Sequence, residues 1–202
     1  MSNTMAKSKA LVPTHNTLTK AFSIVPYLTR EEIKRMVGAI AGRHRTRDEL
    51  LILLLYQTGL RISEALSLTP RMIGAQDGKA VLFVVGKGKK PRMVACPNTL
   101  AHRLKSYAYD QGIEADGRFF NINRKRAWQI VTKLAEDAGI HKRVYPHLLR
   151  HSDAIERLRQ TGNPKALQLH LGHSSPAMTL RYLSTLTAED ALRIQQDVEF
   201  DL

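Results

Sequence analysis

Apolar residues along most of the chain recur at the three- and four-residue spacing that places them on one face of a helix. Residues 29–32 read Thr-Arg-Glu-Glu, a capping box that predicts a helix running to about Ile40. A second helix is predicted to start at Arg47 or Asp48 and to end at Gly59, because glycine readily adopts the left-handed conformation that ends helices. The same spacing predicts helices over residues 62–68, 98–109, 123–138, 146–160, 163–169, 175–183 and 187–198.

The pattern changes to that of strands in one part of the chain. Residues 79–85 are rich in β-branched and apolar side chains, 86–91 combine glycine, lysine and proline, and 92–95 return to a strand pattern. These segments predict a β-hairpin with a basic tip. The expected fold class is therefore mainly α with a small antiparallel β-sheet (α+β). Residues 1–28 show no sustained period and predict a flexible N-terminal tail, followed by one domain over 29–202 that includes the C-terminal helix.

The charge of the chain indicates the class of partner. Its 202 residues include 31 Lys and Arg against 18 Asp and Glu, a formal net charge of +13, which favours binding to a polyanion such as nucleic acid. The longest apolar run, residues 50–56, is far shorter than the roughly 18 residues of a membrane span. The single cysteine, Cys96, excludes an internal disulfide, and the polar first residues do not read as a secretory signal. We expect a cytoplasmic protein without a membrane partner.

Four local groups of residues could carry chemistry. Arg61 follows the helix-ending Gly59, Lys87 lies in the tip of the hairpin, His147 and Arg150 share one helix face, and His173 precedes Tyr182 by nine residues. Each has a structural alternative when taken alone. Arg61 could pair with Glu64 on the surface, His147 could cap a helix, His173 could bond within a core, and Tyr182 could be a core aromatic.

Taken together, the groups resemble a known family. The matching segments are Thr-Gly-Leu-Arg-Ile-Ser-Glu-Ala-Leu at 58–66, Gly-Lys-Gly-Lys-Lys-Pro-Arg at 86–92, Pro-His-Leu-Leu-Arg-His-Ser at 146–152, Leu-Gly-His-Ser-Ser at 171–175 and Arg-Tyr-Leu at 181–183. In this order and spacing they resemble the catalytic domain of the tyrosine recombinases, the phage integrase family. The resemblance implies the catalytic-domain fold of that family. Only about 28 residues precede the matching region, too few for the N-terminal core-binding domain of the family, so we expect either a short form without that domain or a fragment of a longer chain.

The resemblance also implies the site residues and their roles. The catalytic positions it implies are Arg61, Lys87, His147, Arg150, His173 and Tyr182, with Glu64 in support of Arg61. Two guanidiniums suit an anionic phosphodiester, because they bind its oxygens in pairs and offset charge that grows in the transition state. A phenol has an ordinary pKa of about 10 and needs a base and a cationic site to act as a nucleophile. His147 is expected to assist its proton, and Lys87 to protonate the departing 5′ oxygen.

Other basic residues are candidates for DNA contact, although each could equally be solvated. They are Lys89, Lys90, Arg92, Arg124, Lys125, Arg126, Lys142 and Arg143. Lys89 and Lys90 also compete with Lys87 for the role of acid. Trp128 is expected in the core. The spacing of His147 and His151 resembles that of a metal pair, but the family pattern explains His147 better, so we expect no metal and no cofactor.

The function implied is that of a site-specific DNA recombinase or integrase, which cleaves and rejoins double-stranded DNA through a covalent 3′-phosphotyrosine. Two alternatives stay open. One is a catalytically weak, DNA-binding regulatory relative, and the other is a strand transferase of the type IB topoisomerase kind. The apolar side of the predicted C-terminal helix suggests self-association on DNA as a dimer or tetramer, against the alternative that it packs on its own domain.

Overall fold

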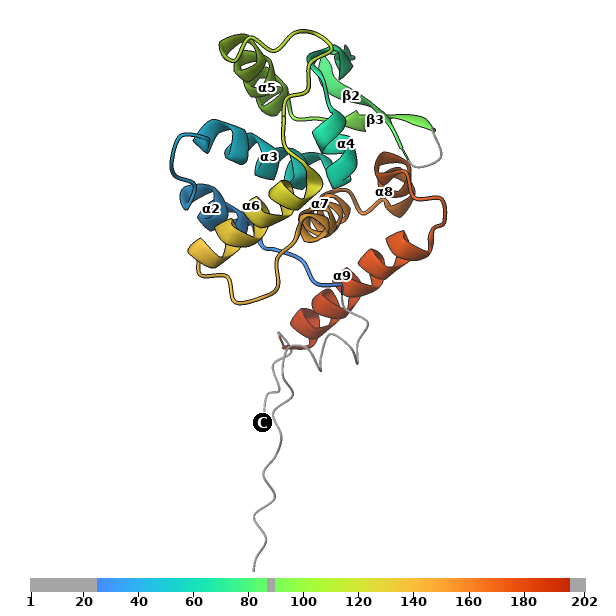
Figure 1. The fold of residues 1–202 in the computed structure, drawn as a ribbon. Coiled ribbons are helices and arrows are strands. Elements are labelled where there is room, and N and C mark those ends of the chain that lie inside the picture. The colour runs from blue at the N-terminus through green and yellow to red at the C-terminus, as the bar shows by residue number, and fades with distance from the viewer. Residues whose placement is uncertain (1–24, 87–89, 197–202) are drawn as a thin grey trace, which may run out of the picture.

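A computed structural model describes residues 25–86 and 90–196, with side chains described to residue 188. Most of this part of the chain is helical, and the fold is mainly α with a small antiparallel sheet, as predicted (Figure 1). The elements, in chain order, are α2 Arg30–Gly38, α3 Arg45–Thr58, α4 Ile62–Ser67, the 3-10 turn η1 Pro70–Met72, β1 Ile73–Gln76, β2 Lys79–Val85, β3 Pro91–Ala95, α5 Asn98–Asp110, α6 Arg124–Asp137, α7 Pro146–Thr161, α8 Pro164–Leu171 and α9 Ala177–Gln196.

Helix α7 lies at the centre of the molecule and separates two apolar cores (Figure 1). The larger core joins α2 to α6 and the sheet to the first turns of α7. The smaller core contains Ala154, Leu158, Leu171, Tyr182 and Leu186, and it lies between α7, α8 and α9. Because α7 contributes to both, side chains near its start lie where the two cores meet.

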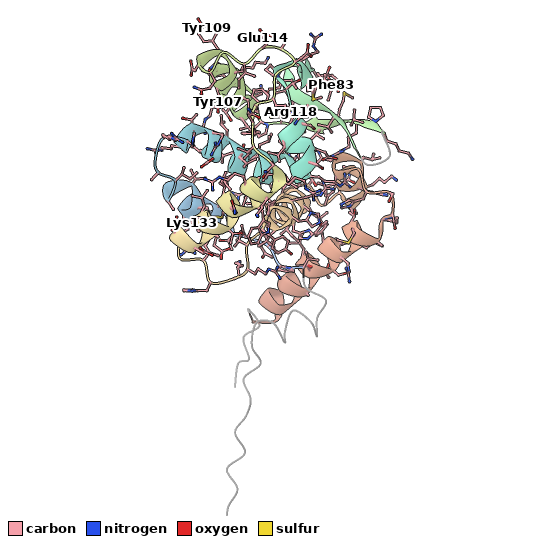
Figure 2. The ribbon with its side chains drawn as sticks, viewed as in Figure 1. Phe83, Tyr107, Tyr109, Glu114, Arg118 and Lys133 are labelled. Atoms are coloured by element: carbon pink, nitrogen blue, oxygen red, sulfur yellow. The ribbon has the colours of Figure 1, made fainter. Side chains whose placement is uncertain are left out.

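The sheet has three strands in the order β1-β2-β3, all antiparallel. The predicted hairpin is its β2–β3 pair, in which Phe83 (labelled in Figure 2) lies opposite Met93. Strand β1 was not predicted, because Gly74, Ala75 and Gln76 carry little strand propensity. A signal for it was present: Asp77 and Gly78 both have positive φ, 50° and 72°, as the Asp-Gly turn of a two-residue hairpin requires.

The two C-terminal helices predicted at 175–183 and 187–198 are wrong, since a single helix, α9, covers Ala177–Gln196. Residues 184–186, between the two predicted helices, do not interrupt it. The hydroxyls of Ser184 and Thr185 donate to the carbonyls of Leu180 and Arg181, four residues earlier, at 3.0 and 2.9 Å. These side chains bond to the helix that carries them and do not compete with it.

The ordered domain begins before the predicted boundary at residue 29. Val25 and Leu28 are buried, and their backbone amides donate to Thr185 and Ser152 at 3.0 and 2.8 Å. Residues 25–28 therefore tie α7 to α9, while 1–24 lie outside the described residues. Among the helices that the structure describes, none is long and apolar enough to cross a membrane.

Candidate active site

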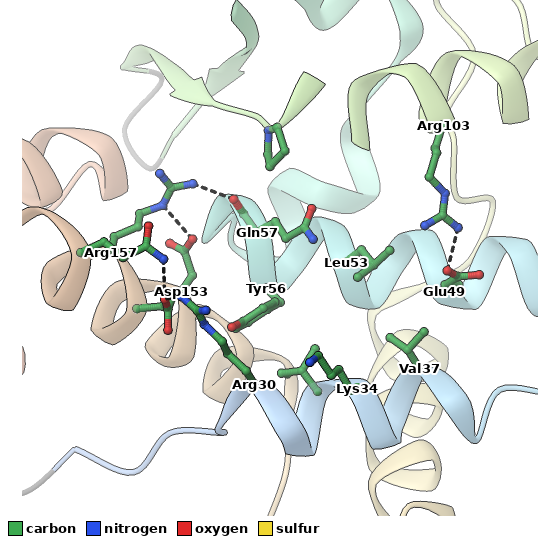
Figure 3. Close-up of a pocket in the computed structure, with 14 residues that line it drawn as sticks. Arg30, Lys34, Val37, Glu49, Leu53, Tyr56, Gln57, Arg103, Asp153 and Arg157 are labelled. Atoms are coloured by element: carbon green, nitrogen blue, oxygen red, sulfur yellow. Dashed lines mark hydrogen bonds and ion pairs between the residues drawn. The ribbon is translucent and has the colours of Figure 1, made fainter. Parts of the chain in front are cut away.

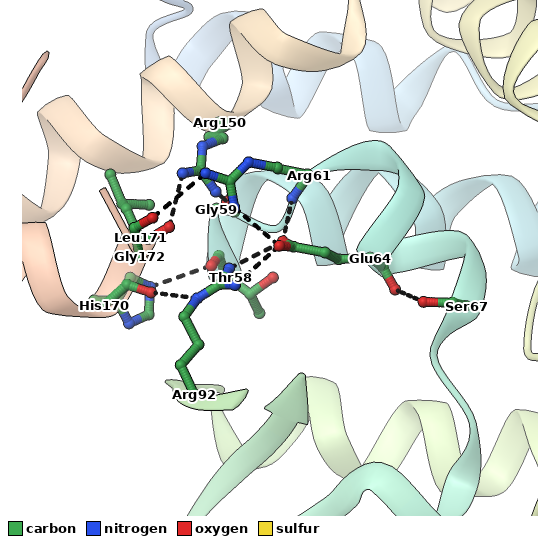
Figure 4. Close-up of polar contacts among 10 residues, drawn as sticks. All are labelled: Thr58, Gly59, Arg61, Glu64, Ser67, Arg92, Arg150, His170, Leu171 and Gly172. Atoms are coloured by element: carbon green, nitrogen blue, oxygen red, sulfur yellow. Dashed lines mark hydrogen bonds and ion pairs between the residues drawn. The ribbon is translucent and has the colours of Figure 1, made fainter. Parts of the chain in front are cut away.

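Two helices end side by side at the centre of the candidate site. Helix α3 ends at Gly59, with φ 59°, and α8 ends at Gly172, with φ 64°. The last carbonyls of a helix lack partners within it and carry partial negative charge. Both helix ends therefore attract cationic donors, and Figure 4 shows the arginines that meet them.

Arg150 bridges the two helix ends. Its Nη1 donates to the carbonyl of Gly59 at 2.5 Å and its Nη2 to that of Leu171 at 2.8 Å. The side chain is 1% exposed. Burial, and after it the nearby charge of Arg61, lower its pKa to about 10, so the guanidinium stays charged at neutral pH. A buried guanidinium with three further N–H groups is a ready donor to an anion.

Arg61 lies at the start of α4, close to the same helix ends. Its Nη1 donates to Glu64 at 3.0 Å and its Nη2 approaches the carbonyl of Gly172 at 3.4 Å. The backbone amide of Arg61 also donates to Glu64, at 2.8 Å. The carboxylate thus holds both the turn and the side chain of Arg61.

Arg92 was expected to contact DNA, but the structure turns it inward. Its two terminal nitrogens each donate to Glu64 at 2.9 Å, and its Nε donates to the carbonyl of His170 at 3.1 Å. Its side chain is 11% exposed. Burial raises the pKa of Glu64, but the hydrogen bonds from Arg92 and Arg61 outweigh it and lower that pKa to about 2. Arg92 is therefore a support of the arginine cluster in this structure.

Tyr182, the expected nucleophile, is buried in α9 and 1% exposed. Its Oη lies 2.6 Å from Nδ1 of His151, which is also buried. Burial raises the pKa of Tyr182 to about 12, and burial, with the charges of its neighbours, lowers that of His151 to about 3. The imidazole is therefore neutral, and in the tautomer with its proton on Nε2 its Nδ1 can accept a hydrogen bond from the phenol.

His151 is the functional candidate that sequence reasoning missed. It was considered only as a metal partner of His147, and its place four residues after His147 on α7 was the available signal. The rings of His147 and His151 meet edge to face, with centroids 4.5 Å apart. His147 is exposed, and its pKa is lowered by burial of part of the ring and by Arg150 and Arg61.

His173 completes the surroundings of the tyrosine. Its ring is stacked with that of Tyr182 at a centroid distance of 6.2 Å, and its Nδ1 lies 3.1 Å from the hydroxyl of Thr179. Burial, then Arg150 and Arg61, lower its pKa to about 4. Arg61, His147, Arg150, His173 and Tyr182 thus come together from α4, α7, the loop after α8, and α9.

The remaining predicted residues lie apart from this cluster or outside the description. Lys87 and Lys89 lie outside the described residues, and Lys90 is exposed beside them. Lys142 donates to the carbonyl of Tyr27 and pairs with Glu32, both at 2.7 Å. Exposed cations line the start of α6 and the loop before α7, namely Arg124, Lys125, Arg126 and Arg143. Trp128 was expected in the core, and this was wrong: it is 45% exposed, one helical turn after Arg124.

A separate cavity of about 720 Å³ lies between α2, α3, α5 and α7 (Figure 3). Three of the four cations that line it are paired with carboxylates: Arg30 with Glu156, Arg103 with Glu49, and Arg157 with Asp153. The arginine cluster shares Arg157 and Asp153 with the cavity wall, but its excess positive charge is larger: the carboxylates of Glu64 and Asp153 leave two of its four guanidiniums without a compensating charge, against one cation in the cavity. Its guanidiniums are those of Arg61, Arg92, Arg150 and Arg157. The arginine cluster is therefore the stronger candidate for an anion site.

The fold and this site define a class of protein, and comparison with known proteins agrees with it. Residues 26–189 match the model of the family described as "Phage integrase family". The chain is 34% identical over 184 residues to tyrosine recombinase XerA of Thermococcus kodakarensis, covering 86% of this chain and 63% of that protein. The chain belongs to the phage integrase family, and its fold is the catalytic-domain fold of the tyrosine recombinases.

Solved structures show the same likeness. A crystal structure of XerA recombinase matches 88% of this chain and 67% of its own length, with 28% identity and a TM-score of 0.70. The XerH site-specific recombinase bound to its difH substrate, in a pre-cleavage complex, matches 79% of this chain and 50% of its own, with 25% identity and a TM-score of 0.69. The chain spans less than two thirds of the length of the curated relatives named first among its matches.

Proposed function

We propose that this chain is the catalytic unit of a site-specific DNA recombinase, which cleaves and rejoins double-stranded DNA through a 3′-phosphotyrosine. The observation that carries the proposal is the convergence of Arg61, Arg150, His173 and Tyr182 from four separate segments, with Arg150 and His173 next to the tyrosine and Arg61 next to both of them. The net charge of +13 and the DNA-bound state of the related XerH structure support DNA as the partner. The role of each residue is proposed below.

The arginine cluster would bind the phosphodiester. Arg61 and Arg150 each keep N–H groups that the carbonyls and Glu64 do not occupy, since a guanidinium has five. The cluster's two uncompensated charges exceed the single charge of a phosphodiester in its ground state. Two positive charges match the two negative charges of the pentacoordinate transition state better. Such a site stabilises the transition state more than the bound substrate, which is the condition for catalysis.

In the chemical step, Oη of Tyr182 would attack phosphorus while the bond to the 5′ oxygen breaks. The phenol proton would pass to Nδ1 of His151, which lies 2.6 Å from Oη, and on toward the exposed His147. The phosphate brings negative charge close to both histidines, which raises their pKa and favours this transfer. The 5′ oxygen would receive its proton from Lys87 of the hairpin tip. Attack by a second DNA hydroxyl on the phosphotyrosine would restore Tyr182 and rejoin a strand, with no cofactor.

The basic residues outside the cluster would hold the DNA backbone. The exposed Arg124, Lys125, Arg126 and Arg143, together with Lys89 and Lys90 of the hairpin and the partly exposed Lys142, are the proposed phosphate contacts. Arg92 is proposed to act through Glu64. Neutralising each contact should reduce the salt dependence of DNA affinity by about one in logarithmic slope.

Helix α9 is proposed to mediate self-association of copies on DNA. It buries Tyr182 and Leu186 against its own domain, while Leu180 and Leu183 stay 52% and 36% exposed on another side. Both faces of the helix therefore carry apolar residues. Replacing Leu180 and Leu183 by glutamine should abolish dimers or tetramers on DNA in sedimentation analysis. Unchanged assembly would remove α9 from the interface.

The direct test is covalent capture. The protein is incubated with nicked duplexes that carry a randomised central region, and adducts are separated on a denaturing gel. We expect a DNA-linked band with the wild type and none with Tyr182→Phe. Binding without any adduct would favour the regulatory alternative, and relaxation of supercoiled plasmid without sequence selection would favour the topoisomerase alternative. An adduct that persists in Tyr182→Phe would remove Tyr182 as nucleophile.

A further inference from the structure

A buried carboxylate lies beneath the arginine cluster, and the proposed chemistry does not use it. Asp153 follows Arg150 by one turn on α7 and is 3% exposed. Its Oδ1 accepts a hydrogen bond from Nε of Arg157 at 2.7 Å, whereas its Oδ2 has no hydrogen-bond partner among the residues that the structure describes. Burying a carboxylate is costly unless its charge is used, so this position needs a physical reason.

Asp153 and its neighbours meet the last turn of α3. Three consecutive carbonyls of that turn each receive one side-chain donor. Nη2 of Arg157 donates to Gln57 at 2.6 Å, Nε2 of His170 to Thr58 at 3.1 Å, and Nη1 of Arg150 to Gly59 at 2.5 Å. Because the acceptor at Thr58 is a carbonyl, His170 carries its proton on Nε2. Asp153 pairs with the first of these donors and lies 4.0 Å from the second.

The carboxylate also packs directly against Gly59. A side-chain carbon added at Gly59 would lie 2.4 Å from Oδ2 of Asp153 and 2.6 Å from Leu171. The close approach places the acid against the turn from which the chain continues, two residues later, to Arg61. Any movement of Asp153 relative to α3 is therefore transmitted to that turn.

His170 connects this cluster to the rest of the site. Its backbone carbonyl accepts from Arg92, which in turn binds Glu64, and Glu64 binds Arg61. The side chain of His170 thus holds the end of α3, while its backbone holds the chain of ion pairs that ends at Arg61. The same small group of residues therefore fixes Arg61 and Arg150, the two arginines that would bind the phosphate.

We propose that Asp153, Arg157 and His170 form a positioning cluster that fixes the end of α3 and with it the relative placement of Arg61 and Arg150. The inference rests on the proposed function for its consequence in catalysis. A misplacement of catalytic groups by about 1 Å can cost about a hundredfold in rate. Loss of the cluster should therefore lower the rate of cleavage at saturating DNA, and leave affinity almost unchanged because many other phosphate contacts remain.

The test compares four variants with the wild type. Asp153→Asn keeps the shape of the side chain and removes its charge, and His170→Leu removes the donor to Thr58. Arg157→Lys keeps a charged donor beside Asp153. Glu156→Gln is the matched control. Glu156 lies on α7, as Asp153 does, but it pairs with Arg30 of α2, so its loss leaves the contacts at the end of α3 in place. Single-turnover adduct formation gives the rate, and fluorescence anisotropy gives the affinity for the same nicked DNA.

We expect Asp153→Asn and His170→Leu to cleave about ten- to a hundredfold more slowly with affinity within about threefold of wild type, while Arg157→Lys keeps most of the rate and Glu156→Gln all of it. Hydrogen exchange across residues 55–66 provides a readout that needs no activity. It should be faster in Asp153→Asn and His170→Leu and unchanged in Glu156→Gln.

The outcomes separate this inference from the proposed function. A wild type that forms no adduct contradicts the recombinase proposal, and the exchange data then still decide the positioning cluster. Wild-type adduct formation with undiminished rates in both Asp153→Asn and His170→Leu overturns the cluster alone, as does unchanged exchange at the end of α3. If Asp153→Asn loses its folded circular dichroism signal, His170→Leu gives the decision.

Discussion

Replacing Glu64 by glutamine tests the ion-pair network that holds Arg61. In the folded protein the pKa of Glu64 falls from 4.5 to about 2, because the hydrogen bonds of Arg92 and Arg61 outweigh the effect of burial. That difference corresponds to about 3 kcal/mol of stability at neutral pH. As the folded-state pKa lies below the unfolded value, this contribution is complete above the ordinary pKa of 4.5 and is lost as the pH falls through about 2.

Urea denaturation of the wild type and of Glu64→Gln measures this contribution. Near neutral pH we expect the variant to be less stable by about 3 kcal/mol, and near pH 4 the difference should shrink by about 1 kcal/mol. Glu156→Gln is the control: its partner Arg30 is 58% exposed, so its loss should cost less than about 1 kcal/mol. The reasoning fails if Glu64→Gln costs no more than the control, or if its cost does not depend on pH.

Three further predictions concern Gly59 at the end of α3 and the histidines His151 and His170. In the same urea assay, Gly59→Ala should lower the free energy of unfolding by about 2 kcal/mol or more, because φ is positive there and the new side chain would contact Asp153. Gly139 also has positive φ but open space around it, so Gly139→Ala should cost about 1 kcal/mol. The pKa values of His151 and His170 are lowered to about 3, below the ordinary value of about 6.5, so the folded protein favours their neutral form. The stability that this contributes is complete above about pH 6.5 and should fall steadily on acidification. A flat pH profile of thermal unfolding would contradict this. His151→Phe removes the hydrogen-bond partner of the Tyr182 phenol, and we expect the tyrosine ring to leave its buried site. Absorbance titration should then show the pKa of Tyr182 lowered from about 12, with Tyr182→Phe as the blank.

Much of the fold follows from local signals. Thr29 forms the predicted capping box with Glu32, and the glycines at 59 and 162 end α3 and α7 in the left-handed conformation that their positions predict. Helix spacing also places His147 and Arg150 together near the start of α7. These features depend on a few neighbouring residues, and the sequence shows such neighbours directly.

Features that depend on distant partners could not be predicted in this way. The inward turn of Arg92 requires Glu64 and the end of α8 to lie beside β3. The contact between His151 and Tyr182 requires α9 to pack on α7. Trp128 is the opposite case: large aromatic residues are usually buried, but the face of α6 that carries it points away from both cores. In each case tertiary packing determines where the side chain lies, and the local sequence pattern does not show it.

The arrangement also explains how so much positive charge can be held at one point without DNA. Four guanidiniums close together would repel one another, but the ends of α3 and α8 direct their carbonyls at all four of them, and Glu64 binds Arg61 and Arg92. A helix end carries only partial charge, so the carbonyls stabilise the arginines without neutralising them. An arriving phosphate then meets donors already in place and does not have to displace a carboxylate from Arg150. In the proposed reaction, fixed donors of this kind would need little reorganisation as charge grows at phosphorus, and such electrostatic preorganisation is usually the largest single contribution to catalysis.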